Sequence, residues 1–247
     1  MQKLCIEYKS RFKQGFVVDF QFKYFGIMQD KCGMKVGTDG VLLGAWALGG
    51  GKMLDIGTGT GLVALMMAQR FPQSVVDAID IDEEACWQAM ENVAASPFAG
   101  RIYVRHSSLQ DFHSSQPYDA IVSNPPFFVD SLKNPDSKRS LARHTDTLSF
   151  ADLFAGAKRL LTEHGSLSIV VPTDVFGRIE EEACYKGFML VRKCMVKTVE
   201  RKAPKRILLT FSRCRDGNLE ESTEVLQSQD GARSEWYARI TEDFYVK

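Results

Sequence analysis

The sequence predicts an α/β fold whose mostly parallel β-sheet ends in an antiparallel C-terminal hairpin. Three observations support this prediction. Between residues 52 and 186, apolar runs of strand length alternate with segments of helical periodicity. A glycine-rich turn at 57–61 joins the first of these runs to a helix. Strand-like segments at 188–198 and 206–212 then follow each other without an intervening helix, which is typical of a hairpin.

Ahead of the glycine-rich turn we expect short elements. Residues 16–20 and 22–28 carry alternating aromatic side chains and predict two short strands. Thr38 or Asp39 is a good N-cap for an apolar helix that would end at the three glycines 49–51.

From residue 52 onward, strands and helices are expected to alternate. Asp82 opens one helix with acids at its positive end, and Ser149 with Asp152 forms a capping box for a later helix that Gly165 follows. Gly187 closes the last helix. The expected strands are 52–56, 74–80, 101–105, 118–123 and 167–171, and the expected helices are 62–71, 82 to about 97, 153–161 and 173–186.

The length of 247 residues predicts one large domain with short appendages. Residues 1–15 are polar, so we expect a loosely ordered N-terminus. Residues 16–215 would form the domain, and 216–247 an acidic C-terminal tail that docks in part. Disorder around 216–232 is the alternative. The docking side chains would be Trp236, Tyr237, Ile240, Phe244 and Tyr245.

Composition excludes several classes of protein. The six cysteines are scattered without a Cys-x-x-Cys pair, and the four histidines are dispersed, so we expect reduced thiols and no metal site. No apolar run approaches the roughly 18 residues of a membrane helix, and the N-terminus lacks a signal-peptide core. These features predict a cytoplasmic protein that does not bind membranes, and nothing indicates an obligate protein partner.

The net charge of zero hides an uneven distribution. Residues 192–215 contain nine Lys and Arg against one acid, Glu200, whereas residues 216–247 contain eight acids against three bases. The basic block indicates an anionic partner. A solvated pair of basic strands is the alternative explanation.

The glycine-rich turn is the predicted cofactor site. Gly57, Gly59 and Gly61 allow a sharp turn and a close approach of the ligand to the backbone. A dinucleotide fingerprint, Gly-x-Gly-x-x-Gly, would require a glycine where the chain has Leu62. Asp55 at the strand end and glycines spaced by two instead favour S-adenosylmethionine, which has no pyrophosphate to place on a helix N-terminus.

Residues after the next two strands complete this site. Asp80 ends the second strand and would accept hydrogen bonds from the ribose hydroxyls. Ile81 would flank the adenine ring. Ser108, with the backbone of Leu109, would lie at the adenine edge after the third strand.

The stretch from Asp119 to Phe127 predicts the catalytic corner. Its apolar run is a buried strand that Pro125 and Pro126 must stop, so Asn124 lies just past the carboxyl end of a strand. The Asn124 amide oxygen and the Pro125 carbonyl can accept two N–H bonds from an aromatic amine, and Phe127 can stack on its ring. Two such acceptors favour the amine's reactive tetrahedral form.

Four features thus follow successive strands: the glycine turn, an acid, a polar turn and Asn-Pro-Pro-Phe. Together they predict a methyltransferase that uses S-adenosylmethionine. An oxidoreductase, a catalytically silent RNA-binding scaffold and a protein methyltransferase are alternatives. Leu62 argues against the oxidoreductase, and the intact Asn-Pro-Pro-Phe argues against a silent scaffold. The basic block argues against a protein methyltransferase.

The chain resembles class I amino-methyltransferases, which have a Rossmann-like sheet. More narrowly, from about residue 16 to 211 it resembles the bacterial tRNA1(Val) adenine-N6 methyltransferase family. The narrower markers are the segment 35–46, the pair Arg143-His144 and the run from Pro204 to Arg206. Asn-Pro-Pro-Phe alone also occurs in ribosomal-RNA guanine-N2 methyltransferases and, with Tyr, in release-factor glutamine and DNA adenine methyltransferases.

The resemblance implies methylation of the N6 amine of adenosine 37 in a valine tRNA, with the base splayed into the pocket. Ser108 departs from the acid that many relatives carry there. Thr38 and Asp39 would close over the cofactor, although helix capping explains them equally well. For Arg143 a structural salt bridge is an alternative to RNA contact. The expected RNA-binding residues are Lys35, Arg143, His144, Arg201, Lys202, Lys205 and Arg206.

Overall fold

The protein is described from a computed structural model, which covers residues 18–32, 35–125, 148–214 and 217–246. The predictions for residues 1–15, and those for Pro126, Phe127, Arg143 and His144, lie outside the described residues.

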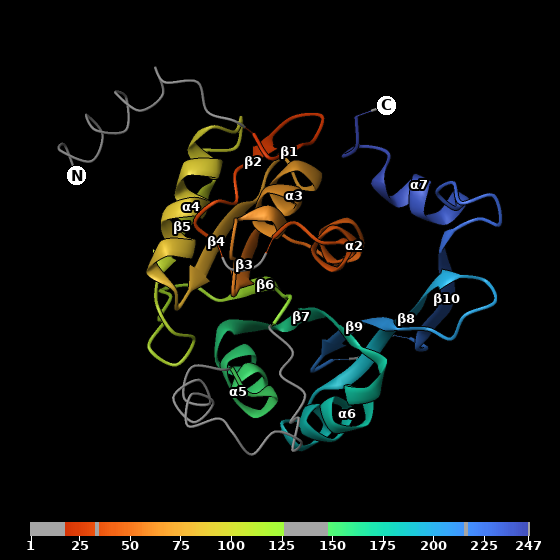
Figure 1. Cartoon of the computed structure of the whole chain (residues 1–247). Coiled ribbons are helices and arrows are strands. Elements are labelled where there is room, and N and C mark those ends of the chain that lie inside the picture. The colour runs from red at the N-terminus through yellow and green to blue at the C-terminus, as the bar shows by residue number, and fades with distance from the viewer. Residues whose placement is uncertain (1–17, 33–34, 126–147, 215–216, 247) are drawn as a thin grey trace, which may run out of the picture.

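An eight-stranded sheet forms the centre of the fold, in the order β10-β8-β9-β7-β6-β3-β4-β5 (Figure 1). All neighbouring pairs are parallel except those made by β9, which runs opposite to β7 and to β8. The strands are β3 (Lys52–Ile56), β4 (Val75–Asp80), β5 (Ile102–His106), β6 (Tyr118–Ser123), β7 (Leu161–Pro172), β8 (Met189–Val199), β9 (Arg206–Ser212) and β10 (Glu220–Gln227).

This topology confirms the predicted mostly parallel sheet with an antiparallel hairpin, β8–β9. The hairpin does not end the sheet, however. β10 pairs in parallel with β8 and becomes the edge strand, in the segment for which the sequence left disorder open. Cross-strand ion pairs help to explain the pairing, since Arg192 lies 2.9 Å from Glu220 and Lys193 lies 2.8 Å from Glu221.

Helices cover both faces of the sheet. In Figure 1, α3 (Leu62–Arg70) and α4 (Glu83–Ala94) lie above its middle, and α5 (Phe150–Leu160) and α6 (Phe176–Tyr185) lie below. α2 (Thr38–Trp46) packs on α3, β7 and β9. A short 3₁₀ turn, η2 (Thr173–Val175), precedes α6.

Alternating strand residues feed two separate cores, as expected for strands buried on both faces. On the face of α2, α3 and α4, the strands contribute Met53, Val122 and Leu208, among others. On the face of α5 and α6 they contribute the neighbouring residues Leu54 and Ile121.

Two helix ends differ from the prediction. Gly37, not Thr38 or Asp39, is the N-cap of α2, and it makes no side-chain capping bond; the helix ends at Trp46, before the three glycines. α5 begins directly after Ser149, whose hydroxyl accepts from the Asp152 N–H at 3.0 Å, as the capping box predicts.

The predicted role of Gly165 at the end of a helix is also wrong, because Gly165 lies within β7 and does not cap α5. A Cβ at this position would stand 2.9 Å from the Tyr118 carbonyl oxygen of β6. The glycine therefore permits close strand approach, a role that sequence alone does not separate from helix termination.

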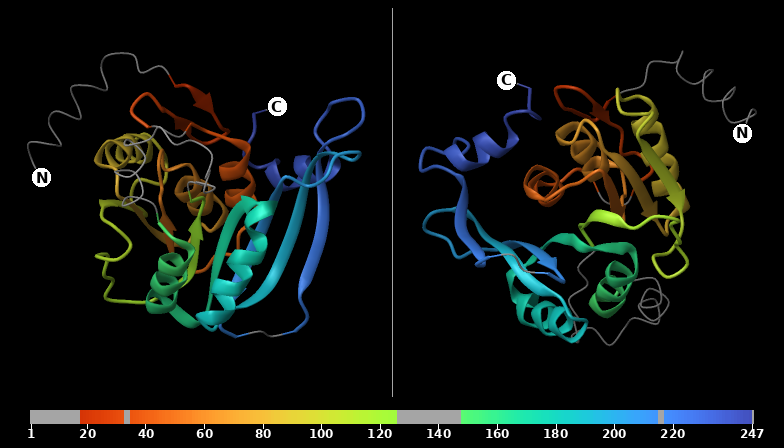
Figure 2. Two further views of the ribbon diagram at one scale, coloured as in Figure 1. Left: turned by 60° about the horizontal axis from the view of Figure 1, so that its bottom comes forward. Right: turned by 180° about the vertical axis from the view of Figure 1, so that it is seen from behind.

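The two ends of the described chain pack together. β1 (Phe20–Gln21) and β2 (Gly26–Ile27) form a small hairpin beside the residues that follow α7 (Glu235–Thr241), and both views in Figure 2 place these segments side by side. Phe22 bridges to Tyr245 and stacks on its ring at 5.8 Å, and Phe244 is buried.

No helix in the described part of the chain is long and apolar enough to span a membrane. Within those same residues, no group of three or more His, Cys, Asp or Glu side chains comes together as a metal site.

Candidate active site

The four predicted turns lie at one edge of the sheet because their strands are parallel neighbours. Ile56 pairs with Ser123 on one side and with Ile79 on the other. Asp80 pairs in turn with His106 at the end of β5. The glycine turn and the Asn124 corner therefore leave adjacent strand ends, where open α/β sheets bind ligands.

The glycine turn requires its three glycines. Gly57, Gly59 and Gly61 have φ values of 71°, 54° and 81°, in the left-handed region that side chains disfavour. The N–H groups of Gly57 and Thr58 both donate to the Ile79 carbonyl, at 2.9 and 3.0 Å. The turn is thereby fixed to the end of β4.

Asp55 lies beneath this turn and is 1% exposed. Its Oδ2 accepts from the Thr58 hydroxyl at 2.6 Å and from the Ala64 N–H in the first turn of α3 at 3.2 Å. The carboxylate thus supplies the helix cap that Gly61, the N-cap residue, lacks. Burial, aided by the charge of Asp80, raises the pKa of Asp55 to about 7 despite these two hydrogen bonds.

Asp80 connects β4 to the glycine turn. Its Oδ2 accepts from the Gly59 N–H at 2.8 Å, and its Oδ1 accepts from the Asp82 N–H at 3.0 Å. A carboxylate has about four acceptor positions, so two N–H bonds leave capacity for ribose hydroxyls. Ile81, the predicted adenine neighbour, is 53% exposed.

In the turn after β5, the predicted residues Ser108 and Leu109 both bond to other groups of the protein. The Ser108 hydroxyl donates to Asp111 Oδ2 at 2.6 Å and accepts from the Asp111 N–H at 3.1 Å. The Leu109 side chain is buried in the core, and its carbonyl accepts from Arg159 at 2.7 Å. The turn has no acid at position 108, but Ser108 holds the exposed acid Asp111 beside it.

Sequence reasoning missed Asp111, although the Ser-x-x-Asp spacing could have revealed it. The same spacing at Ser149 and Asp152 was read correctly as a cap. His106 was also missed: its Nε2 lies 2.9 Å from the Ile81 carbonyl and fixes the backbone beside the predicted adenine site.

The Asn124 corner lies between the sheet and α2. Pro125 is buried, and the Ser123 hydroxyl donates to the Ile56 carbonyl at 2.8 Å, which ties the corner to β3. A Cβ at Gly40 would stand 4.0 Å from Asn124 Nδ2 and 3.1 Å from Leu62 Cδ2. The N-terminal turn of α2 therefore packs directly beside the Asn124 amide.

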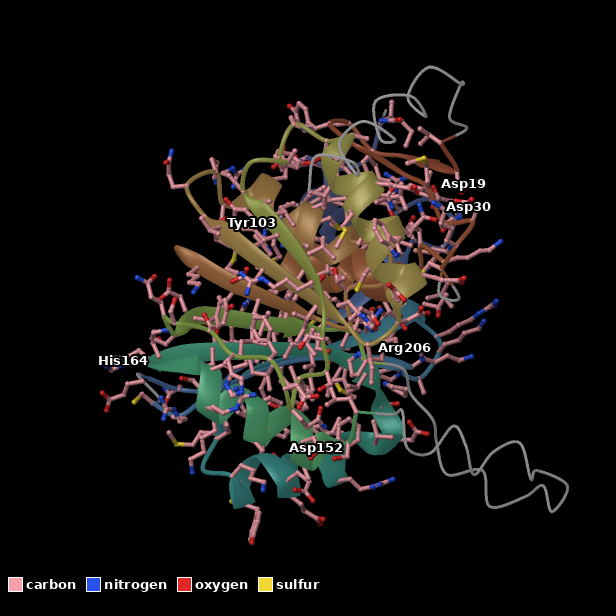
Figure 3. The ribbon with its side chains drawn as sticks, turned by 90° about the vertical axis from the view of Figure 1, so that its left-hand side faces the viewer. Asp19, Asp30, Tyr103, Asp152, His164 and Arg206 are labelled. Carbon is pink, nitrogen blue, oxygen red and sulfur yellow. The ribbon has the colours of Figure 1, made fainter. Side chains whose placement is uncertain are left out.

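Thr38 and Asp39 begin this turn of α2. Thr38 is exposed, whereas Asp39 accepts a hydrogen bond from Arg206 Nε at 2.6 Å. Arg206 starts β9 and also donates to the Lys205 carbonyl at 3.0 Å. Figure 3 shows Arg206 at the opposite end of β7 from His164, on the side of the sheet where the turns gather.

Seven of the nine bases in the basic block fall into two groups. Of the other two, Arg213 donates to the Leu161 and Thr162 carbonyls, and Arg215 lies outside the described residues. Four of the seven form ion pairs within the protein: Arg192 with Glu220, Lys193 with Glu221, Lys197 with Glu200, and Arg206 with Asp39. Arg201, Lys202 and Lys205 are exposed and form no ion pair with another described residue. Lys35, just ahead of α2, is also exposed.

These groups suit S-adenosylmethionine. Positive-φ glycines admit close approach to the backbone, Asp80 offers acceptors for a ribose, and Ile81 offers an exposed apolar surface to a purine ring. When bound, this cofactor supplies an electrophilic methyl group on a sulfonium. The adjacent Asn124 corner offers an amide to the group that would receive it.

Known proteins of similar sequence agree with this chemistry. Residues 39–178 match the family model of the methyltransferase small domain. A protein of Parabacteroides distasonis is 47% identical over 92% of this chain and 98% of its own length, and one of Bacteroides thetaiotaomicron is 48% identical over 92% and 97%. One of Pseudoalteromonas translucida is 42% identical over 92% and 98%. All three are named tRNA1(Val) (adenine(37)-N6)-methyltransferase.

Solved structures support the fold alone. A protein described as a predicted O-methyltransferase from Agrobacterium tumefaciens has a TM-score of 0.64 at 15% identity, over 83% of this chain and 96% of that one. The fold is thus that of class I methyltransferases, and S-adenosylmethionine is the methyl donor. By sequence, by fold and by the order of its strand-end turns, the chain belongs to the tRNA1(Val) (adenine(37)-N6)-methyltransferase family.

Proposed function

We propose that this protein transfers a methyl group from S-adenosylmethionine to the N6 amine of adenosine 37 in tRNA1(Val), in the cytoplasm. The observation that carries the proposal is the pairing of Ile56 with Ser123, which sets the glycine turn and the Asn124 corner side by side. The names of the relatives supply the tRNA and the base.

The cofactor site in this proposal is formed by the strand-end turns and the start of α2. The turn glycines and Asp80 hold the methyl donor, Ile81 flanks its adenine, and Asp55 holds the turn from below. Asp111, presented by Ser108, supports the adenine edge. Thr38 and Asp39 enclose the site from α2.

Asn124 and the Pro125 carbonyl receive the target amine and orient its lone pair towards the methyl group. Positioning and electrostatics account for the rate in this scheme, and no covalent intermediate with the enzyme is needed. Pro126, Phe127, Arg143 and His144 remain part of the proposal from sequence, with Phe127 as the stacking partner of the base.

For RNA binding we propose the exposed bases Arg201, Lys202 and Lys205 as phosphate contacts, with Lys35 at the start of α2. Arg206 differs from them, because its Nε and Nη1 donate to groups of the protein itself. We assign Arg206 to holding the basic loop 200–205 against α2 while the exposed bases contact RNA.

Nucleoside mass spectrometry tests the function. The purified protein should convert adenosine to N6-methyladenosine in a tRNA1(Val) transcript supplied with S-adenosylmethionine, and a transcript with guanosine at position 37 should stay unmodified. Bulk tRNA from cells should contain this N6-methyladenosine only when the gene is present. Methylation of guanine N2 in ribosomal RNA, or of a release-factor glutamine, would replace the proposal with one of its alternatives.

A further inference from the structure

Asn92 belongs to α4 and not to any of the four strand-end turns, and it is 1% exposed. Its side chain bonds to the backbone of two segments far apart in the chain. Oδ1 accepts from the Met28 N–H at 2.8 Å, while Nδ2 donates to the Met28 carbonyl and to the Thr60 carbonyl, each at 2.9 Å. A single buried amide therefore joins the N-terminal region to the glycine turn.

The N-terminal segment involved, residues 28–32, is called the strap below. Four residues before Asn92 on the same helix, Gln88 accepts from the Lys31 N–H at 3.0 Å and is fully buried. Cys32 Sγ lies 3.6 Å from the position that a Cβ on Gly59 would occupy. The strap thus runs from Asn92 past Gln88 to the glycine turn at Gly59.

The turn itself gives a reason for such a contact. Thr60 lies between Gly59 and Gly61, both at positive φ, and glycines lose more conformational freedom on ordering than other residues. A hydrogen bond to the Thr60 carbonyl restrains the peptide plane that joins Thr60 to Gly61. The bond comes from α4, a helix packed on the sheet, so the restraint is anchored in the core.

We propose that Asn92 is a positioning residue for S-adenosylmethionine binding. Asn92 fixes the glycine turn and the strap relative to each other. Asn92 does not touch the reacting atoms. It acts through the Thr60 carbonyl on one side and through the Met28 peptide groups on the other. The inference rests on the cofactor site and is independent of which RNA base is methylated.

A comparison of Asn92→Ala with Gln88→Ala tests this role. Both side chains are buried on one face of α4 and both bond to the strap. Among the described residues, however, the Gln88 side chain bonds to Lys31 and Glu91 and not to the glycine turn. Loss of the buried hydrogen bond to the Thr60 carbonyl should weaken binding of S-adenosylhomocysteine roughly tenfold in Asn92→Ala, measured by titration calorimetry without RNA. Gln88→Ala should weaken it by less than about threefold.

Kinetics and stability separate positioning from general destabilisation. In Asn92→Ala the KM for S-adenosylmethionine should rise by a similar factor, while kcat at saturating cofactor and the KM for tRNA change little. Equal losses of cofactor affinity in the two variants, or unchanged affinity in Asn92→Ala, would overturn the proposal. If Asn92→Ala does not fold, Asn92→Asp takes its place: it keeps an acceptor for Met28 N–H but, when ionised, cannot donate to Thr60.

Absence of any tRNA methylation alongside normal cofactor binding would count against the proposed function and leave this inference standing. Absence of cofactor binding in the unaltered protein would remove both.

Discussion

Charged side chains have different partners in two parts of the sheet. We call the carboxyl ends of β3 and β4, with Asp55 and Asp80, the acidic side, and the strands β8 and β10 the basic side. At the ends of β3 and β4, Asp55 and Asp80 are held by neutral donors, namely backbone N–H groups and a hydroxyl. In β8 and β10, by contrast, Arg192 and Lys193 are matched by acids directly across the strand pair.

This difference separates charges available to a ligand from charges already neutralised. Backbone N–H donors carry no positive charge that would neutralise a carboxylate, and Asp80 has acceptor positions left for the cofactor. Bases that are already paired within the protein attract RNA little, because a neighbouring acid matches their charge. We therefore propose that the loop 200–205, where the bases are unmatched by other described residues, is the part of the basic block that contacts RNA.

The largest expected effect on activity comes from Asn124, which follows β6 beside the acidic side. Asn124→Ala should lower kcat about 10²- to 10³-fold, by analogy with the loss of one preorganised hydrogen-bonding group at a reacting centre. Cofactor affinity should change little because the glycine turn and Asp80 are untouched. Single-turnover methylation and calorimetric titration with S-adenosylhomocysteine measure the two quantities, and near-normal turnover would remove Asn124 from the mechanism.

The next effect concerns the buried acid. The folded pKa of Asp55 is about 7 against an ordinary value of 3.8, so the folded protein binds this proton more tightly than the unfolded chain. The stabilisation is complete below about pH 4 and is lost as the pH rises to about 7.

Asp55→Asn removes this titration and keeps an acceptor for Thr58 and Ala64. The Tm of the variant minus that of the unaltered protein should therefore increase between pH 4 and pH 7, by roughly 5 °C or more, and then level off. Thermal melts across this range measure it. A Tm difference that does not vary with pH would mean that Asp55 is ionised throughout this range, and that burial does not raise its pKa.

The acidic side was largely predictable from sequence because its signals are local. Positive-φ glycines, a strand-ending acid and a proline-stopped strand each occupy a few adjacent residues, and parallel pairing brings them together without further information. Asp111 escaped notice because the acid was expected at position 108 itself and is presented there by a serine.

The basic side was less predictable because its pairing is nonlocal. An excess of nine bases over one acid in 192–215 indicated an anionic partner, yet part of that partner is the chain's own acidic tail. Nothing local in residues 220–227 shows that they pair in parallel with β8.

Asn92 was missed for the same reason, since a lone Asn in a helix does not reveal contacts with residues 28 and 60.

The smallest effect sharpens the comparison within the basic block itself. Arg201→Ala combined with Lys202→Ala should weaken tRNA binding several-fold and reduce the slope of log affinity against log salt by roughly 1.5, because each lost phosphate contact removes about 0.7–0.9. The matched control is Lys193→Ala combined with Lys197→Ala, which also removes two charges but from bases paired with Glu221 and Glu200. Filter binding across a salt series should show a nearly unchanged slope for this control. Equal slope changes in the two double variants would mean that RNA competes successfully for the paired bases, and the whole block would then form the RNA-binding surface.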